Sequence, residues 1–204
     1  MSKQVIVDYI GSIQFTPEQI TESMAQNNGK VILSGVMQRG STPDEKNFNQ
    51  NGRSYPLGIL KREADKYKKV FVAERRALGE LDHPESSVVN LSNVSHNVLD
   101  LWWDGNDLMG KIEILPTLSG NIAKELLRAG IRLGISSRGM GSVKNLGEGK
   151  VEVEGDFEIV CWDLVSNPST QGAFMDNLNE SVQPQKVDKY TKVNSLISDI
   201  ISIM

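Results

Sequence analysis

Residues 91–115 read LSNVSHNVLDLWWDGNDLMGKIEIL, and this stretch decides the fold class. Apolar residues dominate its two halves, and the turn-forming run at 104–107 separates them. The pattern predicts two strands, over 91–103 and 108–115, that pair as a β-hairpin. Because the strands of a hairpin run in opposite directions, we expect the chain to contain an antiparallel sheet.

Helix and strand patterns alternate on both sides of this hairpin. They predict helices from residue 17 onwards, over 55–67 and over 120–129, and strands over 31–37 and 131–137. Residues 151–159 are expected to form either a half-exposed strand pair or one bulged strand. Ser119 is the expected N-cap of the third helix, which Gly130 closes. Strands interleaved with a few helices predict an α+β domain, with a β-barrel-like antiparallel or mixed sheet flanked by helices.

The globular pattern fades towards the C-terminus. Residues 176–188 are polar and are predicted to be a linker. After them, apolar residues three and four positions apart predict an amphipathic tail helix over 189–204: Tyr190, Val193, Ile197, Ile200 and Met204. We therefore expect one domain over residues 1–175, with residues 1–30 as a candidate regulatory segment, followed by a linker and a tail.

Composition restricts the classes of function. The single cysteine, Cys161, excludes an internal disulfide framework and a cysteine-rich zinc module. A net charge of −4 gives no reason to expect nucleic-acid binding. No apolar tract approaches the ~20 residues of a membrane helix, and the N-terminus does not resemble a signal peptide. We therefore expect a soluble cytoplasmic protein.

With only two histidines, histidine chemistry has two candidate locations. His96 lies in an alternating apolar strand and is expected to be a structural core residue. His83 follows two acids, Glu80 and Asp82, which raises the alternative of a metal site. Their spacing matches no established zinc motif, so we expect no metal. A purely structural role for His83 also stays open at this stage.

A second candidate segment, LGISSRGMGS at 133–142, places two hydroxyls at the end of an apolar strand, before glycines. A nucleophilic serine needs this setting, with a rigid strand end and backbone amides that can point at an oxyanion. The segment is neither a Gly-x-Ser-x-Gly elbow nor a phosphate-binding loop. A plain glycine turn after a strand is the simpler alternative.

A third candidate is Asp163, a single acid within an apolar strand. A buried carboxylate without a partner is costly, so Asp163 is expected to contact either Arg138 or His83. Cys161 lies two residues earlier with nothing basic nearby in the sequence, and we expect an inert buried thiol.

Taken together, five segments resemble, in order, the prohead maturation proteases of T-even-type myophages. They are NGRSYP at 51–56, ALGELDHP at 77–84, LWWDGND at 101–107, GISSRGMGS at 134–142 and DLVSNPS at 163–169. The resemblance covers about residues 30–175. That family is related to the herpesvirus assembly proteases, so the resemblance implies a β-barrel surrounded by helices and a serine nucleophile.

The resemblance also implies roles for individual residues. His83 would be the general base and Asp163 the residue that orients it. Ser137 would be the nucleophile, because Ser137-Arg138-Gly139 matches the family's Ser-x-Gly pattern. Ser136 would point to the other face of the strand. Arg138 and the amide of Gly139 are the candidates for the oxyanion hole, and no cofactor is implied.

By the same resemblance, the chain would be an endopeptidase acting inside the prohead in the host cytoplasm, as a homo-oligomer. Its substrates would be scaffold or core proteins and the major capsid protein, cut after glutamate in Leu/Ile-x-Glu sequences. The chain itself contains four such triplets, ending at Glu22, Glu80, Glu148 and Glu180.

The triplet that ends at Glu180 lies in the predicted linker, so self-cleavage there would release the tail. The tail would dock the zymogen in the scaffold core, or alternatively pack on its own domain. Two other functions stay open: an inactive scaffold-associated core protein and a metal hydrolase.

Overall fold

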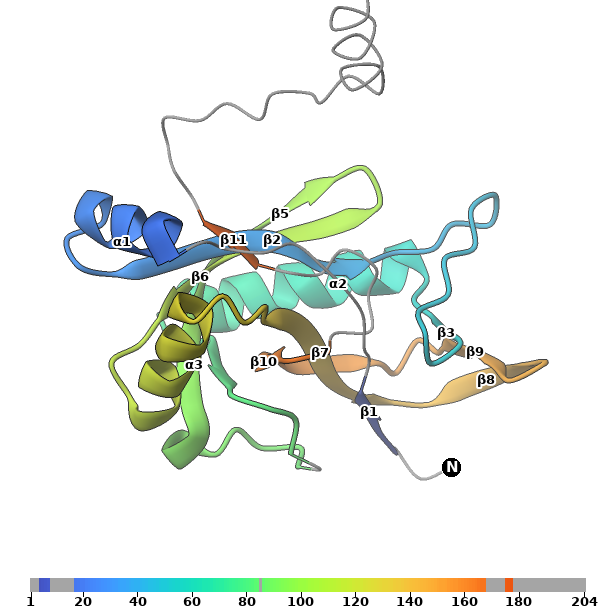
Figure 1. Cartoon of the computed structure of the whole chain (residues 1–204). Helices are drawn as coiled ribbons and strands as arrows, with labels where there is room; N and C mark the ends of the chain where they lie inside the picture. The colour runs from blue at the N-terminus through green and yellow to red at the C-terminus, as the bar shows by residue number, and fades with distance from the viewer. Residues whose placement is uncertain (1–3, 8–16, 85, 168–174, 178–204) are drawn as a thin grey trace, which may run out of the picture.

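The computed structural model describes residues 4–7, 17–84, 86–167 and 175–177 of the chain (Figure 1). Residues 178–188 of the predicted linker, which include Glu180, and the predicted tail helix over 189–204 lie outside these ranges. Within them, no helix combines the length and apolar character that a membrane crossing requires.

Three α-helices and eleven strands make up the described part of the chain. The helices are α1 (Pro17–Gln26), α2 (Leu57–Tyr67) and α3 (Leu118–Arg128), with a π-helical turn at Lys68–Val72 and a 3₁₀ turn at Leu91–Asn93. The strands are β1 (Gln4–Val7), β2 (Val31–Arg39), β3 (Arg53–Ser54), β4 (Leu78–Glu80), β5 (Val94–Asp104), β6 (Asp107–Ile114), β7 (Gly134–Gly141), β8 (Val143–Gly147), β9 (Lys150–Val153), β10 (Glu158–Val165) and β11 (Met175–Asn177).

The predicted hairpin is confirmed as the centre of a five-stranded antiparallel sheet. Its order is β11-β2-β6-β5-β4, and the hairpin closes at the pair Asp104 and Asp107. The first strand starts at Val94 rather than at residue 91. The side chain of Asn90 accepts a hydrogen bond from the backbone N–H of Ser92, at 3.1 Å, and this local bond favours a 3₁₀ turn over the strand.

Two three-stranded sheets complete the α+β fold, in the orders β1-β7-β10 and β3-β9-β8. An isolated parallel bridge between Leu81 and Leu164 joins the end of β4 to β10. Strand pairing in the described residues does not close these sheets into a barrel, so the barrel stays a prediction.

Helix α2 runs between the five-stranded sheet and the β7–β10 pair (Figure 1). Its apolar face packs into the core as predicted, with Leu60, Ala64 and Tyr67 at most 2% exposed. The ring of Tyr67 meets Trp162 of β10 edge-on, with 4.9 Å between ring centroids. This contact fixes β10 against the helix and places one face of β10 in the hydrophobic core.

Three further features of local structure differ from what the sequence suggested. The N-cap of α3 is Thr117, not Ser119, because Thr117 Oγ1 accepts from the N–H of Gly120 at 3.0 Å. The glycines after Arg138 do not form a turn, since β7 continues through them. A Cβ at Gly139 would lie 2.5 Å from the Phe157 ring, so that glycine permits close packing inside a strand.

The third concerns the start of the linker. Asp176 and Asn177 pair with β2 in strand β11, although both were assigned to the linker. The predicted linker therefore begins at least two residues too early, because a short strand added to a sheet edge carries little apolar periodicity.

Candidate active site

The candidate residues converge where the end of β4 meets β7 and β10. The bridge between Leu81 and Leu164 fixes this junction, and the backbone N–H of Asp82 donates to the Leu164 carbonyl at 2.7 Å. Asp82 has a φ of +69°, in the left-handed region that aspartate tolerates better than most residues. This sharp turn brings the ring of His83 to β10.

The central contact joins His83 to Asp163. Nδ1 of His83 lies 2.8 Å from Oδ2 of Asp163, and the two side chains are 2% and 0% exposed. A carboxylate can only accept here, so Nδ1 carries the proton and Nε2 is the ring nitrogen that can take up another. The pair has the geometry of a general base and the group that orients it.

Asp163 is held in its ionised form. Burial by itself would raise the pKa of this carboxyl group. The hydrogen bond from His83, the charge of Arg138 and the backbone N–H of Glu80 outweigh burial, so the pKa is lowered from its usual value. The Glu80 N–H donates to Asp163 Oδ1 at 2.9 Å.

Both partners expected for Asp163 are present, because Arg138 contacts it as well as His83. Arg138 is fully buried, with Nη2 at 3.2 Å from Oδ1 and Nε at 3.0 Å from Oδ2 of Asp163. The same Nη2 lies 2.6 Å from Oε1 of Glu80, which is also fully buried. A buried ion-pair network therefore lies behind the His83–Asp163 pair.

Sequence reasoning considered Glu80 as a metal ligand and as the end of a Leu/Ile-x-Glu triplet, and missed this role. The signal was present, because Glu80 lies between Gly79 and Leu81 in an apolar stretch, as Asp163 does in its own strand. A carboxylate in such a position calls for a buried cation, and Arg138 lies within a strand of the same type.

Arg138 and Gly139, the residues predicted for the oxyanion hole, make other contacts in the structure. The guanidinium of Arg138 is engaged by Asp163, Glu80 and the Ser86 carbonyl, the last at 2.8 Å from Nη1. Gly139 lies in the central strand of its sheet, paired with Ile6 on one side and Ile159 on the other. In the structure Arg138 is thus an ion-pair partner of Asp163 and Gly139 packs against Phe157, and their part in an oxyanion hole stays a prediction.

The strand register separates the two serines. Ser136 pairs with Asp163, whereas Ser137 pairs with Trp162. Directly opposed residues of an antiparallel pair share a face, with Cβ atoms about 4.5–5.5 Å apart. Ser136 thus lies on the face of Asp163, and Ser137 on the face of the core residue Trp162. This geometry favours Ser136 as a candidate nucleophile beside Ser137, the serine predicted from the sequence.

His96 and Cys161 are buried as expected. His96 is 0% exposed, with Nδ1 at 2.9 Å from Ser95 Oγ and Nε2 at 3.1 Å from the Trp162 carbonyl. Burial lowers the pKa of His96 to about 4, so its ring is neutral at pH 7. Burial also raises the pKa of Cys161, which stays a thiol.

The residues of the metal alternative do not converge on one point. Glu80 faces Arg138 and His83 faces Asp163. In the part of the chain that the structure describes, no group of three or more histidine, cysteine or acidic residues could hold an ion.

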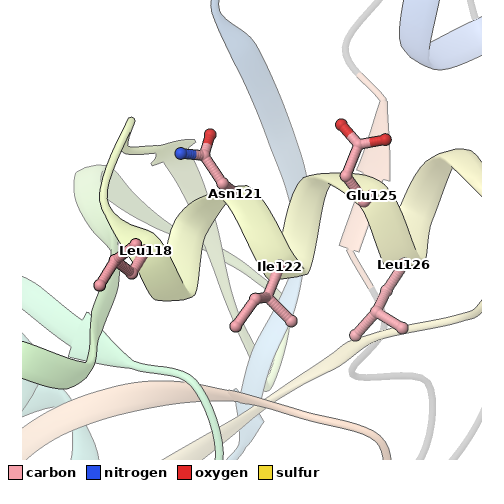
Figure 2. Close-up of a pocket in the computed structure, with 5 residues that line it drawn as sticks. All are labelled: Leu118, Asn121, Ile122, Glu125 and Leu126. Carbon is pink, nitrogen blue, oxygen red and sulfur yellow. The ribbon is translucent and has the colours of Figure 1, made fainter.

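A groove of about 670 Å³ lies elsewhere, along α3 (Figure 2). Its described lining consists of Leu118, Asn121, Ile122, Glu125 and Leu126. Leu118 and Ile122 are 82% and 54% exposed. This groove is a surface feature of one helix and includes none of the candidate catalytic residues.

Comparison with known proteins identifies relatives of the chain. The model of a family described as prohead core protein serine protease matches residues 9–183. The prohead core protein protease of Enterobacteria phage T4 is 35% identical over 130 residues. That match covers 62% of this chain and 61% of the relative, less than two thirds of the relative's length. The solved structure of the bacteriophage T4 capsid assembly protease superposes with a TM-score of 0.65 at 24% identity, over 81% of this chain and 99% of that one.

Proposed function

Because the chain belongs to the family of prohead core protein serine proteases, we propose that it is a serine endopeptidase of phage prohead maturation. Its substrates would be scaffold or core proteins and the major capsid protein. The observation that carries this proposal is the 2.8 Å contact between His83 and Asp163 on the strand pair that also bears Ser136. A herpesvirus-like barrel is the fold that this activity would use, and the bridge from β4 to β10 supports it.

In this proposal Ser136 is the nucleophile. Its Oγ attacks the carbonyl carbon of the scissile bond while its proton passes to Nε2 of His83. When the C–N bond breaks, His83 returns that proton to the leaving amine, and water then hydrolyses the acyl-enzyme by the same route. Proton transfer of this kind contributes roughly 10²–10⁴ in rate.

Asp163 fixes the ring of His83 and stabilises the imidazolium that forms during each step. Its lowered pKa keeps it charged for this task. The donors that stabilise the oxyanion are not assigned among the described residues.

Cleavage after glutamate in Leu/Ile-x-Glu sequences is part of the same proposal. Of the chain's own four triplets, Glu80 is buried in the active-site network and is a poor substrate in the folded enzyme. Glu180, which follows β11 by three residues, is the preferred self-cleavage site, and its cleavage would release the predicted tail helix 189–204.

The enzyme would act as a homo-oligomer inside the prohead, in the host cytoplasm. The exposed apolar residues of α3, Leu118 and Ile122, offer a surface for self-association (Figure 2). Light scattering on the full chain tests this part of the proposal, and a mass equal to the 22.5 kDa of one chain would contradict it.

The experiment that tests the function is co-expression of the chain with its scaffold protein, read by intact-mass spectrometry. We expect cleaved scaffold and loss of residues 181–204 from the wild type, neither from Ser136→Ala, and both from Ser137→Ala. Ser137→Ala is the matched control, since it removes the same hydroxyl one residue away.

Three other outcomes would change the conclusion. Processing by Ser136→Ala but not Ser137→Ala would restore Ser137 as the nucleophile. Unprocessed scaffold with the wild type would favour the inactive core protein. Activity that survives both substitutions and is lost with a chelator would favour a metal hydrolase.

A further inference from the structure

The buried network around Arg138 contains one more carboxylate than its single positive charge can balance. One cation would satisfy one carboxylate, yet a second carboxylate is buried beside it. Oxygen Oε2 of Glu80 is buried with no hydrogen-bond partner among the described residues. Such an arrangement is costly for stability, and an apolar residue would be easier to bury. Glu80 therefore calls for an explanation other than stability.

We propose that Glu80 is a positioning residue of the active site, which acts on His83 through Arg138 and Asp163. It holds the Asp163 carboxylate in place and supplies the negative charge that lets His83 take up a proton. This inference rests on the proposed serine peptidase function.

The positioning role follows from the contacts of Glu80. Its backbone N–H holds Oδ1 of Asp163 at 2.9 Å, and its side chain draws Nη2 of Arg138 to 2.6 Å. Arg138 competes with His83 for Asp163, since its Nε is already 3.0 Å from Oδ2. Without the charge of Glu80, the guanidinium would be attracted to Asp163 alone and would weaken its bond to His83.

The loop after His83 depends on the same pair. Asn90 donates its backbone N–H to Oε1 of Glu80 at 3.0 Å, and Arg138 donates to the Ser86 carbonyl at 2.8 Å. The chain on both sides of His83 is thus tied to the Glu80–Arg138 pair, which limits movement of the ring away from Asp163.

The charge role follows from counting the groups packed around His83. Asp163 and Glu80 are negative and Arg138 is positive, which sums to −1 while His83 is neutral. The other titratable groups packed near Asp163 are neutral at pH 7: the pKa of His96 is lowered to about 4, and burial raises the pKa of Tyr67 and of Cys161.

Asp82, next to His83, is exposed to solvent and therefore screened. Proton uptake by His83 then brings the buried cluster to neutrality. With an uncharged residue in place of Glu80, the same proton would leave a buried net charge of +1, which is unfavourable at low dielectric.

The test is Glu80→Gln in the full chain, because glutamine keeps the size of Glu80 and removes its charge. The two histidine ring signals are followed by NMR against pH, with His83→Asn used to assign them. We expect the titration midpoint of His83 to move to lower pH by about one unit. On a peptide substrate, kcat should fall about tenfold with KM nearly unchanged, because a weaker base transfers the proton less well.

Two further variants separate charge from structure. Glu80→Asp keeps the charge on a shorter side chain, so it should retain the midpoint of the wild type. Glu113→Gln removes a buried carboxylate of β6 that pairs with Lys30 and Arg75, and it should change neither readout. If Glu80→Gln does not fold, a shifted midpoint in Glu80→Asp overturns the inference.

An unchanged His83 midpoint in folded Glu80→Gln also overturns the inference, even if kcat falls. A shifted midpoint in a chain that cleaves no scaffold contradicts the peptidase function instead. The two failures are therefore distinguishable.

Discussion

Both histidines of the chain contact β10, at neighbouring residues, but their ring nitrogens meet different kinds of partner. His83 follows a turn and donates to the carboxylate of Asp163, whereas His96 lies within β5 and contacts the carbonyl of Trp162. A carboxylate can balance the charge of a protonated ring, and a buried carbonyl cannot. Burial lowers the pKa of His96 to about 4, whereas His83 has a carboxylate at one ring nitrogen that can orient its ring.

Gly79 makes the His96 arrangement possible. A Cβ at Gly79 would lie 2.4 Å from the His96 ring and 2.0 Å from the Trp162 carbonyl oxygen, so only glycine lets β4 pass this close. One residue further along, Glu80 enters the ion-pair network. Two neighbouring residues of β4 therefore serve different histidines: Gly79 packs against the structural His96, and Glu80 belongs to the network behind the candidate catalytic His83.

The largest difference in kcat is expected between the variants that remove one or the other imidazole ring. His83→Ala should lower kcat by roughly 10⁵–10⁶-fold, because the proposed general base is lost. His96→Ala should leave the kcat of the folded fraction near that of the wild type while it lowers stability. Activity against a peptide substrate, normalised to folded protein by circular dichroism, measures both. Equal losses for the two variants would remove the distinction.

A smaller effect is expected when the partner of His83 is neutralised. Asp163→Asn keeps the shape of the side chain but no longer favours the Nδ1–H tautomer, so kcat should fall by about 10⁴-fold. The matched variant for His96 is Ser95→Ala, which removes the hydroxyl 2.9 Å from Nδ1 and should leave kcat almost unchanged. Steady-state kinetics at a pH above 7 checks the pair, and a loss below tenfold for Asp163→Asn would contradict the assigned role.

The smallest expected effect is on how the free energy of unfolding depends on pH. His96 has a pKa of about 4 when folded and 6.5 as a model group, so the unfolded chain binds the proton first as pH falls. Its contribution to stability is present above pH 6.5 and is lost as pH falls towards 4, by about 3 kcal/mol in total.

Urea unfolding of the wild type and His96→Gln, each at pH 7 and pH 4.5, measures this contribution. The loss of stability between the two pH values should be smaller for His96→Gln. The lowered pKa of Asp163 acts in a separate window, because its contribution is present above the usual aspartate value and is lost only at lower pH. Equal losses for both proteins would mean that His96 titrates normally.

Particular residues show how far the sequence could predict the site. Asp163 was predicted to contact either Arg138 or His83, because a lone acid in an apolar strand needs a partner, and the family resemblance implied its pairing with His83. Glu80 was missed because the Arg138 that explains it lies 58 residues away. Ser136 and Ser137 are adjacent in one strand and lie on opposite faces of it. Only the register with the partner strand shows which of the two shares a face with Asp163.

Among the elements of the fold, strong local patterns were predicted well. The hairpin of β5 and β6 and the helix α2 carry clear turn signals or apolar periodicity, and both were confirmed. The alternative of a plain turn at the glycines of β7 was wrong, because Gly139 is needed where the strand packs against the ring of Phe157, which lies elsewhere in the sequence.

By itself, the sequence determined the α+β class, the hairpin, the core face of α2 and the three segments that carry the candidate site. These depend on periodicity, turn chemistry and the cost of a buried charge, which act over a few residues. Tertiary structure decided which serine faces Asp163, that Arg138 contacts the carboxylates of Asp163 and Glu80, and that Glu80 joins this network. These depend on strand register, where a shift of one residue moves every side chain to the other face.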